Sequence, residues 1–67
     1  MIKTRDGYEV EVGMWVSDTT GVYEVQGIDA MYVDLREVFF HEDGSGDYTL
    51  IGRRRLLHSE LRHMDYL

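Results

Sequence analysis

The 67-residue sequence contains no cysteine and no proline, and it has only seven lysine and arginine residues against thirteen aspartate and glutamate residues. The absence of cysteine excludes disulfides and cysteine-based metal sites, and it suits a reducing compartment. Without proline, bends depend on glycine and short polar side chains, and strand edges have no proline to protect them. The net charge of −6 disfavours general binding to phosphate backbones and favours a basic partner.

The sequence also lacks long hydrophobic runs. No segment of about 20 apolar residues is present, and the first residues lack the apolar core of a signal peptide. We therefore expect no membrane segment and a cytoplasmic location in a bacterial cell. The length predicts one small domain spanning residues 1–67, and the hydrophobic content of 43% is ordinary for a globular chain.

Apolar and polar residues alternate in short segments, and the alternation restarts after glycine. Residues 8–12 alternate strictly between apolar and acidic side chains, which is typical of a strand with one buried and one solvated face. Gly13 indicates a bend, after which Met14 and Val16 continue the buried face and Trp15 points the other way.

Further segments extend this predicted sheet. Strands are expected at 2–4, 22–28, 31–40 and 48–52. Polar loops are expected at 17–21 and 41–47. Within these strands, Tyr23 and Val25 should point inward. The alternation in the longest strand changes phase, which a single bulge near Arg36 and Glu37 would repair.

The hydrophobic period changes near the C-terminal end. Leu57, Leu61 and Met64 fall at positions i, i+4 and i+7, which is typical of a helix, with Ser59 as its expected N-cap. About five short strands with bends at glycine, followed by a short helix or helical turn, predict a mainly β fold. We expect a small, strongly bent antiparallel sheet or an SH3-like barrel.

Two stretches carry a resemblance to a known group of proteins. Residues 6–16 (DGYEVEVGMWV) and 20–25 (TGVYEV) resemble the opening of small SH3-like barrel proteins of bacteria and their phages. In those proteins a glycine precedes a Trp-Val strand start, and a second glycine opens the next strand. The resemblance covers roughly residues 6–40 and implies a barrel topology and a phage or mobile-element origin. It carries over no functional residue, because the chain has no ALYDY-like run and no paired tryptophan for a proline-rich ligand.

Carboxylates are spread along the whole chain. Four of them are predicted on the outer face of neighbouring strands: Glu9, Glu11, Glu24 and Asp34. Such a patch would imitate the phosphates of a nucleic acid and occupy the basic cleft of a nuclease or DNA-binding protein. The alternative is a solvated face with no partner.

Eight aromatic residues exceed what a small core needs, so some are expected at the surface. Trp15 is the best anchor for a protein contact, the alternative being that it packs under the terminal helix. The adjacent Phe39 and Phe40 cannot both point inward on a regular strand, which leaves one of them for contact with a second copy of the chain.

The run Arg53, Arg54 and Arg55 is the one cationic cluster, and Arg62 follows it. Arginine matches phosphate geometry, so these residues and nearby Tyr48 define a nucleic-acid-binding alternative. Pairing with carboxylates across the sheet is the competing interpretation. On a strand, Arg54 would point away from the other two.

No residue set has the pattern of a catalytic or metal site. His58 and His63 are five residues apart, whereas zinc ligands on one helix face favour a spacing of three or four. We expect no enzyme activity, no cofactor and no metal. The sequence therefore predicts a protein-binding module, an inhibitor or DNA mimic of phage or mobile-element origin, of the anti-CRISPR kind, that occupies a basic surface of a host nuclease or defence protein. The alternatives are a small nucleic-acid-binding barrel and a homo-oligomeric structural protein, such as a homodimer.

Overall fold

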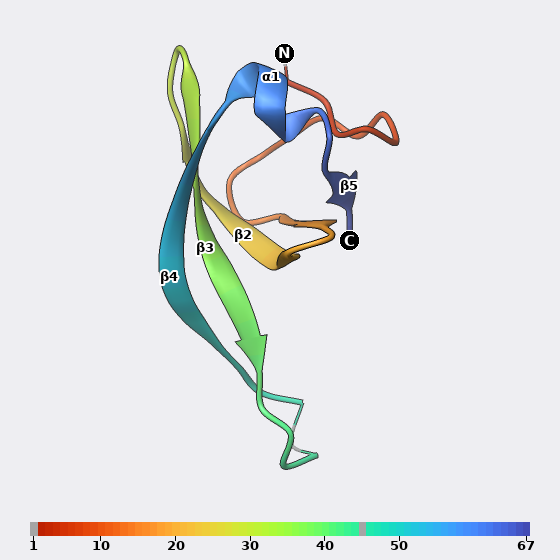
Figure 1. Ribbon diagram of the computed structural model, residues 1–67, viewed down its shortest axis with the longest axis vertical. Helices are drawn as coiled ribbons and strands as arrows, with labels where there is room; N and C mark the ends of the chain where they lie inside the picture. The colour runs from red at the N-terminus through yellow and green to blue at the C-terminus, as the bar shows by residue number, and fades with distance from the viewer. Residues whose placement is uncertain (1, 45) are drawn as a thin grey trace.

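The structure is a computed structural model that describes residues 2–44 and 46–67 as one antiparallel sheet with a short helix (Figure 1). The elements are β1 (Trp15–Asp18), β2 (Gly21–Ile28), β3 (Tyr32–Phe40), β4 (Tyr48–Leu57), α1 (His58–Leu61) and β5 (Asp65–Tyr66). The strand order is β4-β3-β2-β1-β5. The predicted mainly β class, with five strands and a C-terminal helical turn, is confirmed. The sheet is bent and open, with β4 and β5 as its edges among the described residues.

The strand predicted at residues 8–12 is wrong. Glu9 makes one isolated bridge with Lys3, and the edge strand predicted at 2–4 is reduced to that same bridge. Val10 is buried, whereas the other two apolar side chains of residues 8–12 are exposed. The glycines that flank this segment have φ values of 91° and 95°, so turns on both sides limit its pairing. The fifth strand is instead β5, which pairs with β1.

The main core lies on one face of the sheet and is closed by α1 and the N-terminal segment. Tyr23 and Val25 point inward, as predicted, and Leu61 and Met64 cover them from the C-terminal end. The buried cluster comprises Val10, Val16, Tyr23, Val25, Val33, Leu35, Leu56, Leu61 and Met64.

Two register shifts bend the sheet. β2 carries one extra residue, Gln26, relative to β3. β4 carries Gly52 as an extra residue opposite the step from Arg36 to Glu37. A register shift does occur at the predicted position, but the extra residue lies on the partner strand, so the predicted repair of the alternation within residues 31–40 is wrong. Because β3 itself stays regular there, Val38 turns to the face opposite Leu35 and the core, where it is only 5% exposed.

The structure corrects the boundaries of the predicted helix. Its N-cap is Leu57 rather than Ser59, because β4 continues directly into α1. The Leu57 backbone N–H donates a hydrogen bond of 2.9 Å to Glu60 Oε1, so a glutamate supplies the cap. Leu61 and Met64 are buried as predicted, whereas Leu57 is exposed.

The loop predicted at 17–21 is also shorter than expected. β1 continues to Asp18 and β2 begins at Gly21, which leaves a two-residue turn. The Asp18 carboxylate accepts hydrogen bonds from the Thr20 N–H and the Thr20 hydroxyl, at 2.8 and 2.5 Å. This side chain therefore fastens the turn.

The end of the β3–β4 hairpin projects beyond the rest of the molecule (Figure 1). Pairing of β2 with β3 ends at Glu37, whereas β3 and β4 remain paired to Phe40 and Tyr48. Residues 38–50, which we call the arm, therefore have no third strand beside them. The molecule measures 38 × 21 × 18 Å, and its radius of gyration is 11.8 Å, against about 11 Å for a compact chain of this length.

Candidate functional site

Three aromatic side chains meet at the base of the arm, on the face opposite the core. The Trp15 ring centroid lies 4.9 Å from that of Tyr48 and 5.6 Å from that of Phe40, both edge to face. Phe40 and Tyr48 are direct partners across the β3–β4 ladder. We call these three residues the aromatic cluster. It joins the arm to β1, which is distant from it in strand order.

Trp15 lies on the opposite side from Val16, as predicted, and it is partly buried. It packs against the arm rather than under the terminal helix, so that alternative is wrong. The indole Nε1 donates a hydrogen bond of 3.0 Å to Glu24 Oε2, and Gln26 Nε2 donates one of 2.9 Å to Glu24 Oε1. These bonds fix the carboxylate beside the ring.

Phe39 and Phe40 lie on opposite faces of the arm, because they are consecutive residues of one strand. Their side chains are 51% and 46% exposed. The Phe39 ring contacts His41 edge to face at 5.9 Å, and His41 Nε2 lies 2.6 Å from Thr49 Oγ1. The prediction that they cannot both enter the core is confirmed, since neither belongs to it.

The arm carries charge of one sign. Residues 38–50 contain Glu42, Asp43 and Asp47 and no lysine or arginine. The His41 N–H donates a hydrogen bond of 3.0 Å to the Asp47 carbonyl oxygen and closes the loop. The arm therefore combines exposed aromatic rings at its base with an acidic tip.

The four carboxylates predicted to form an outer patch do not share one strand surface. Glu24 and Asp34 lie on the outer face of the sheet, but Glu9 and Glu11 lie in the N-terminal segment outside the named strands. Asp34 Oδ1 lies 3.4 Å from Arg55 Nε. The outer face of the sheet therefore carries both positive and negative side chains, whereas residues 38–50 carry only negative ones.

The three consecutive arginines alternate between faces, as predicted. Arg54 points to the core side, where its Nη1 lies 2.9 Å from Asp18 Oδ2 and its guanidinium lies 5.1 Å above the Tyr23 ring. The hydrogen bonds from Thr20 and Arg54 lower the pKa of the Asp18 carboxyl, although burial, the largest single influence, raises it.

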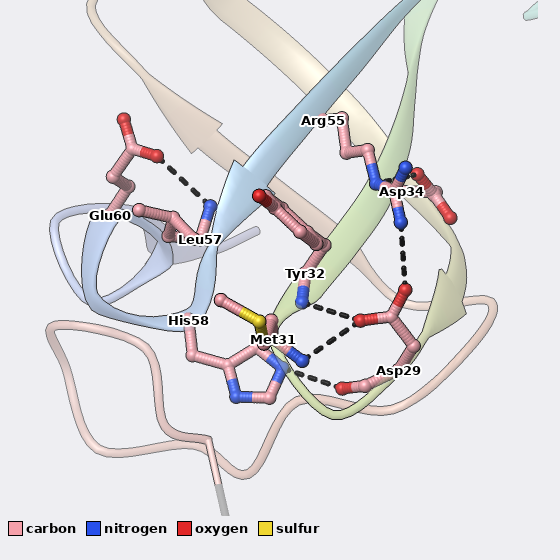
Figure 2. A network of polar contacts seen from close by, with 8 residues as sticks. All are labelled: Asp29, Met31, Tyr32, Asp34, Arg55, Leu57, His58 and Glu60. Atoms are coloured by element: carbon pink, nitrogen blue, oxygen red, sulfur yellow. Dashed lines mark hydrogen bonds and ion pairs between the residues drawn. The ribbon is translucent and has the colours of Figure 1, made fainter.

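Arg55 belongs to a network that fastens the β2–β3 turn to the end of β4 (Figure 2). Its Nη2 lies 2.9 Å from Asp29 Oδ2, and its guanidinium lies 4.3 Å above the Tyr32 ring. Asp29 Oδ1 accepts hydrogen bonds from the N–H groups of Met31 and Tyr32 at 2.9 and 2.6 Å. These backbone bonds, followed by Arg55, lower the pKa of the Asp29 carboxyl.

The four arginines of the nucleic-acid-binding alternative are therefore in different situations. Two of them, Arg54 and Arg55, are paired with carboxylates of the chain itself. Arg53 and Arg62 are exposed and make no ion pair within residues 2–44 and 46–67. A continuous cationic surface built from all four does not form, because the strand separates the run by faces.

The described part of the chain contains no group of three or more histidine, aspartate and glutamate side chains placed to hold a metal ion. None of its helices is long and apolar enough to cross a membrane.

No protein-family profile, no curated protein and no solved structure matches the chain. Function is therefore inferred from the arm and its surroundings. Of the residues that build this surface, the sequence indicated Trp15, Glu24 and one of Phe39 and Phe40 as protein contacts, and it placed Tyr48 in the nucleic-acid-binding alternative. A signal was present in the sequence, because residues 38–50 combine three aromatic residues with three carboxylates and no lysine or arginine, but residues 8–23 share that composition and so composition alone does not select the arm.

Proposed function

We propose that the protein is a non-enzymatic binding module that inserts its arm into a basic surface of another protein. The observation that supports this is a projecting hairpin with two half-exposed phenylalanines and an acidic tip. Aromatic side chains are enriched at the centres of protein interfaces, where they supply most of the binding energy. An acidic tip speeds the encounter with a basic partner.

The arm is suited to this role because contacts within the protein hold its paired strands in place. Trp15 supports it from one side, and the Phe40–Tyr48 pair keeps the two strands in register. A preorganised surface loses less conformational entropy on association than a flexible loop. The partner therefore gains contact with aromatic rings that are fixed in place.

The partner that we favour is a host nuclease or nucleic-acid-binding defence protein in the bacterial cytoplasm. Its basic cleft normally holds phosphates, and the carboxylates of the arm would take their place. The resemblance to small phage barrel proteins and the net charge of −6 both support such an inhibitor. The exposed Phe39 also leaves homodimer formation as a competing use of the arm.

The first experiment is a tagged pulldown from bacterial lysate, with and without nuclease treatment, read by mass spectrometry. We expect one basic protein in stoichiometric amount that survives nuclease. Prey that disappears after nuclease treatment would favour the alternative function, in which Arg53 and Arg62 contact nucleic acid.

A matched pair of charge reversals identifies the binding surface. Replacing Glu42 and Asp43 by lysine should abolish capture of the partner, because it reverses the charge of the tip. Replacing Glu9 and Glu11 by lysine makes the same change in net charge outside the arm and should leave most of the capture intact. Equal loss in both folded variants would contradict a role for the arm, and loss only in the second would move the contact to the N-terminal segment.

A further inference from the structure

A pair of arginines faces each other on the outer side of the sheet. Arg36 of β3 and Arg53 of β4 are direct partners across the ladder, next to the bulge at Gly52. Like charges that lie directly opposite each other destabilise a sheet unless something neutralises them. The next residue in this row, on β2, is Glu24.

Neither arginine forms an ion pair with a carboxylate among the residues that the structure describes. Arg36 Nη2 donates a hydrogen bond of 3.0 Å to the Leu50 carbonyl oxygen, and its Nε is covered without a hydrogen-bond partner. Glu24 faces it across the β2–β3 ladder, but that carboxylate is bonded to Trp15 and Gln26. Arg53 makes no ion pair within the described ranges and is exposed.

The two arginines line a groove of about 480 Å³. Its walls contain four arginines, of which Arg54 and Arg55 are paired with Asp18 and Asp29, so the other two supply its unpaired positive charge. The full lining is Gln26, Asp34, Leu35, Arg36, Arg53, Arg54 and Arg55. Asp34, the carboxylate among these residues, lies 3.4 Å from Arg55, so its charge is directed to that residue.

We propose that Arg36 and Arg53 bind a phosphate group in this groove. Guanidinium groups present several N–H donors in a plane and match the oxygens of phosphate or carboxylate with two parallel bonds. A phosphate near neutral pH carries between one and two negative charges, enough to offset two opposed arginines, whereas a carboxylate offsets one. The groove is larger than a phosphate ion, which leaves room for the group that carries it.

This site adjoins the arm, because Arg36 donates a hydrogen bond to the carbonyl oxygen of the arm residue Leu50, but the proposal does not rest on the protein-binding function. Trp15 and Glu24 share the outer face with the two arginines, in the same row across β1 to β4. The phosphate is either free or part of a small molecule such as a nucleotide. Both sources present the same oxygens to the arginines.

The test uses the whole chain labelled with ¹⁵N and follows the arginine side-chain Nε–H signals by NMR. Inorganic phosphate is titrated at constant ionic strength, with chloride replaced in proportion. We expect saturable shifts of the Arg36 and Arg53 signals and no comparable shift of Arg62. The Arg36 Nε–H is a good probe because it is covered from solvent.

Arg53→Gln should weaken phosphate binding about tenfold, because one charge-assisted contact is lost. Arg62→Gln removes the same charge outside the groove and should leave the affinity unchanged. Arg36→Lys keeps the charge but loses the planar fork, and it should weaken binding too. It serves as the second variant if Arg53→Gln fails to fold.

Chemical-shift changes that do not saturate would overturn the proposal, because they would reflect general charge screening. An affinity for phosphate that falls equally in Arg53→Gln and Arg62→Gln would overturn it for the same reason. A nucleoside monophosphate is titrated as a second arm. Either tighter or equal binding of the nucleotide supports the site. Tighter binding of the nucleotide than of phosphate indicates a phosphate carried by a small molecule, whereas equal binding indicates that the phosphate group alone is recognised. Binding of a single-stranded oligonucleotide without binding of either small ligand would overturn it in favour of a nucleic-acid surface.

Discussion

Three aspartate side chains fasten turns or chain ends, and each is held in its charged form. Asp29 caps the β2–β3 turn, Asp18 caps the β1–β2 turn, and Asp6 accepts hydrogen bonds from the Thr4 hydroxyl and the Tyr66 N–H. Hydrogen bonds to the carboxylates lower the pKa of all three below the ordinary value of 3.8.

These lowered pKa values give stability a dependence on pH. The folded chain releases protons from these groups more readily than the unfolded chain, so the free energy of unfolding rises with pH in this range. We expect stability to be constant above pH about 5 and to fall as the pH drops below the ordinary value of 3.8 and through the lowered values. Urea unfolding at several pH values measures this.

Asp29→Asn serves as the control for that measurement. The amide keeps the shape of the side chain but does not titrate, so the variant should lose part of the dependence on pH below 4 while remaining folded at pH 7. A wild-type stability that stays constant from pH 5 to pH 2.5 would contradict the assignment of these carboxylates.

Sequence patterns predicted individual residues well where a period of two was sufficient. Tyr23 and Val25 point inward, and Arg54 separates from its two neighbours, because alternation along a strand decides both outcomes. Glu9 and Glu11 were misplaced for a different reason. Their segment alternates perfectly, but it lies between two turns and forms one isolated β-bridge instead of a strand. The alternation of side chains does not indicate whether a segment has a strand to pair with.

At the scale of elements, the bulge on β4 lies next to the arm, at Gly52. Gly52 has a φ of 45°, a conformation that residues with a Cβ rarely adopt, and a Cβ at this position would meet no atom within 4 Å. Any cost of substitution therefore comes from the backbone and not from crowding. Gly27 provides the comparison, because its φ is not positive and a Cβ there would meet Asp34 at 3.8 Å, an ordinary contact.

We expect Gly52→Ala to lower the free energy of unfolding by about 1 kcal/mol, the usual cost of a left-handed conformation in a residue with a side chain. Gly27→Ala should change it by less than about 0.5 kcal/mol. Thermal and urea unfolding of both variants test the difference. Equal destabilisation would mean that the bulge on β4 does not depend on the left-handed glycine.

The sequence predicted β2 and β3 nearly in full, but it predicted β4, the longest strand, only over residues 48–52, and it did not predict the shortest strand, β5. β2 and β3 each carry enough residues for alternation to appear. The phase change in β3 does not reflect a bulge in that strand, because the extra residue is Gly52 on β4. β5 has two residues, too few for any pattern. It forms because tertiary contacts hold it: Val16 and Ser17 pair with it, and Arg5 bonds to Asp65 through two nitrogens at 2.9 and 2.6 Å.

At the scale of the whole molecule, the exposed edge of β4 raises the question of self-association. A long free strand edge is a template for pairing with another chain. Here three arginines and the bulge at Gly52 occupy that edge, and charged residues and bulges are both devices that discourage edge pairing. The edge is therefore protected by the same run of residues that suggested nucleic-acid binding.

We expect the isolated protein to be a monomer of 7.9 kDa at micromolar concentration. Light scattering across a concentration series measures the mass. A mass that doubles as concentration rises would favour the homodimer, and Phe39→Thr would then show whether the arm forms the contact. A constant monomer mass would leave the arm available for a different protein.

The mainly β class was predictable because it depends on properties of the whole sequence, such as length, composition and the number of alternating segments, and not on the exact position of any one residue. A short chain without cysteine, with frequent glycine and several alternating segments, has few folds open to it, and a bent antiparallel sheet is one. The projection of the arm was not predictable, because it depends on where β2 stops pairing with β3. That boundary is set by the register of two strands and not by either sequence alone.

The contact between Arg5 and Asp65 joins residues 60 positions apart in the sequence. The sheet order places β5 against β1, so the innermost hairpins are able to form early while the last strand waits for the chain to close on itself. Folding slows as contacting residues become more distant in sequence, since the entropy of closing the loop is lost before the contact is gained. A protein this small is therefore expected to fold slowly for its size, with the joining of its two ends as a late step.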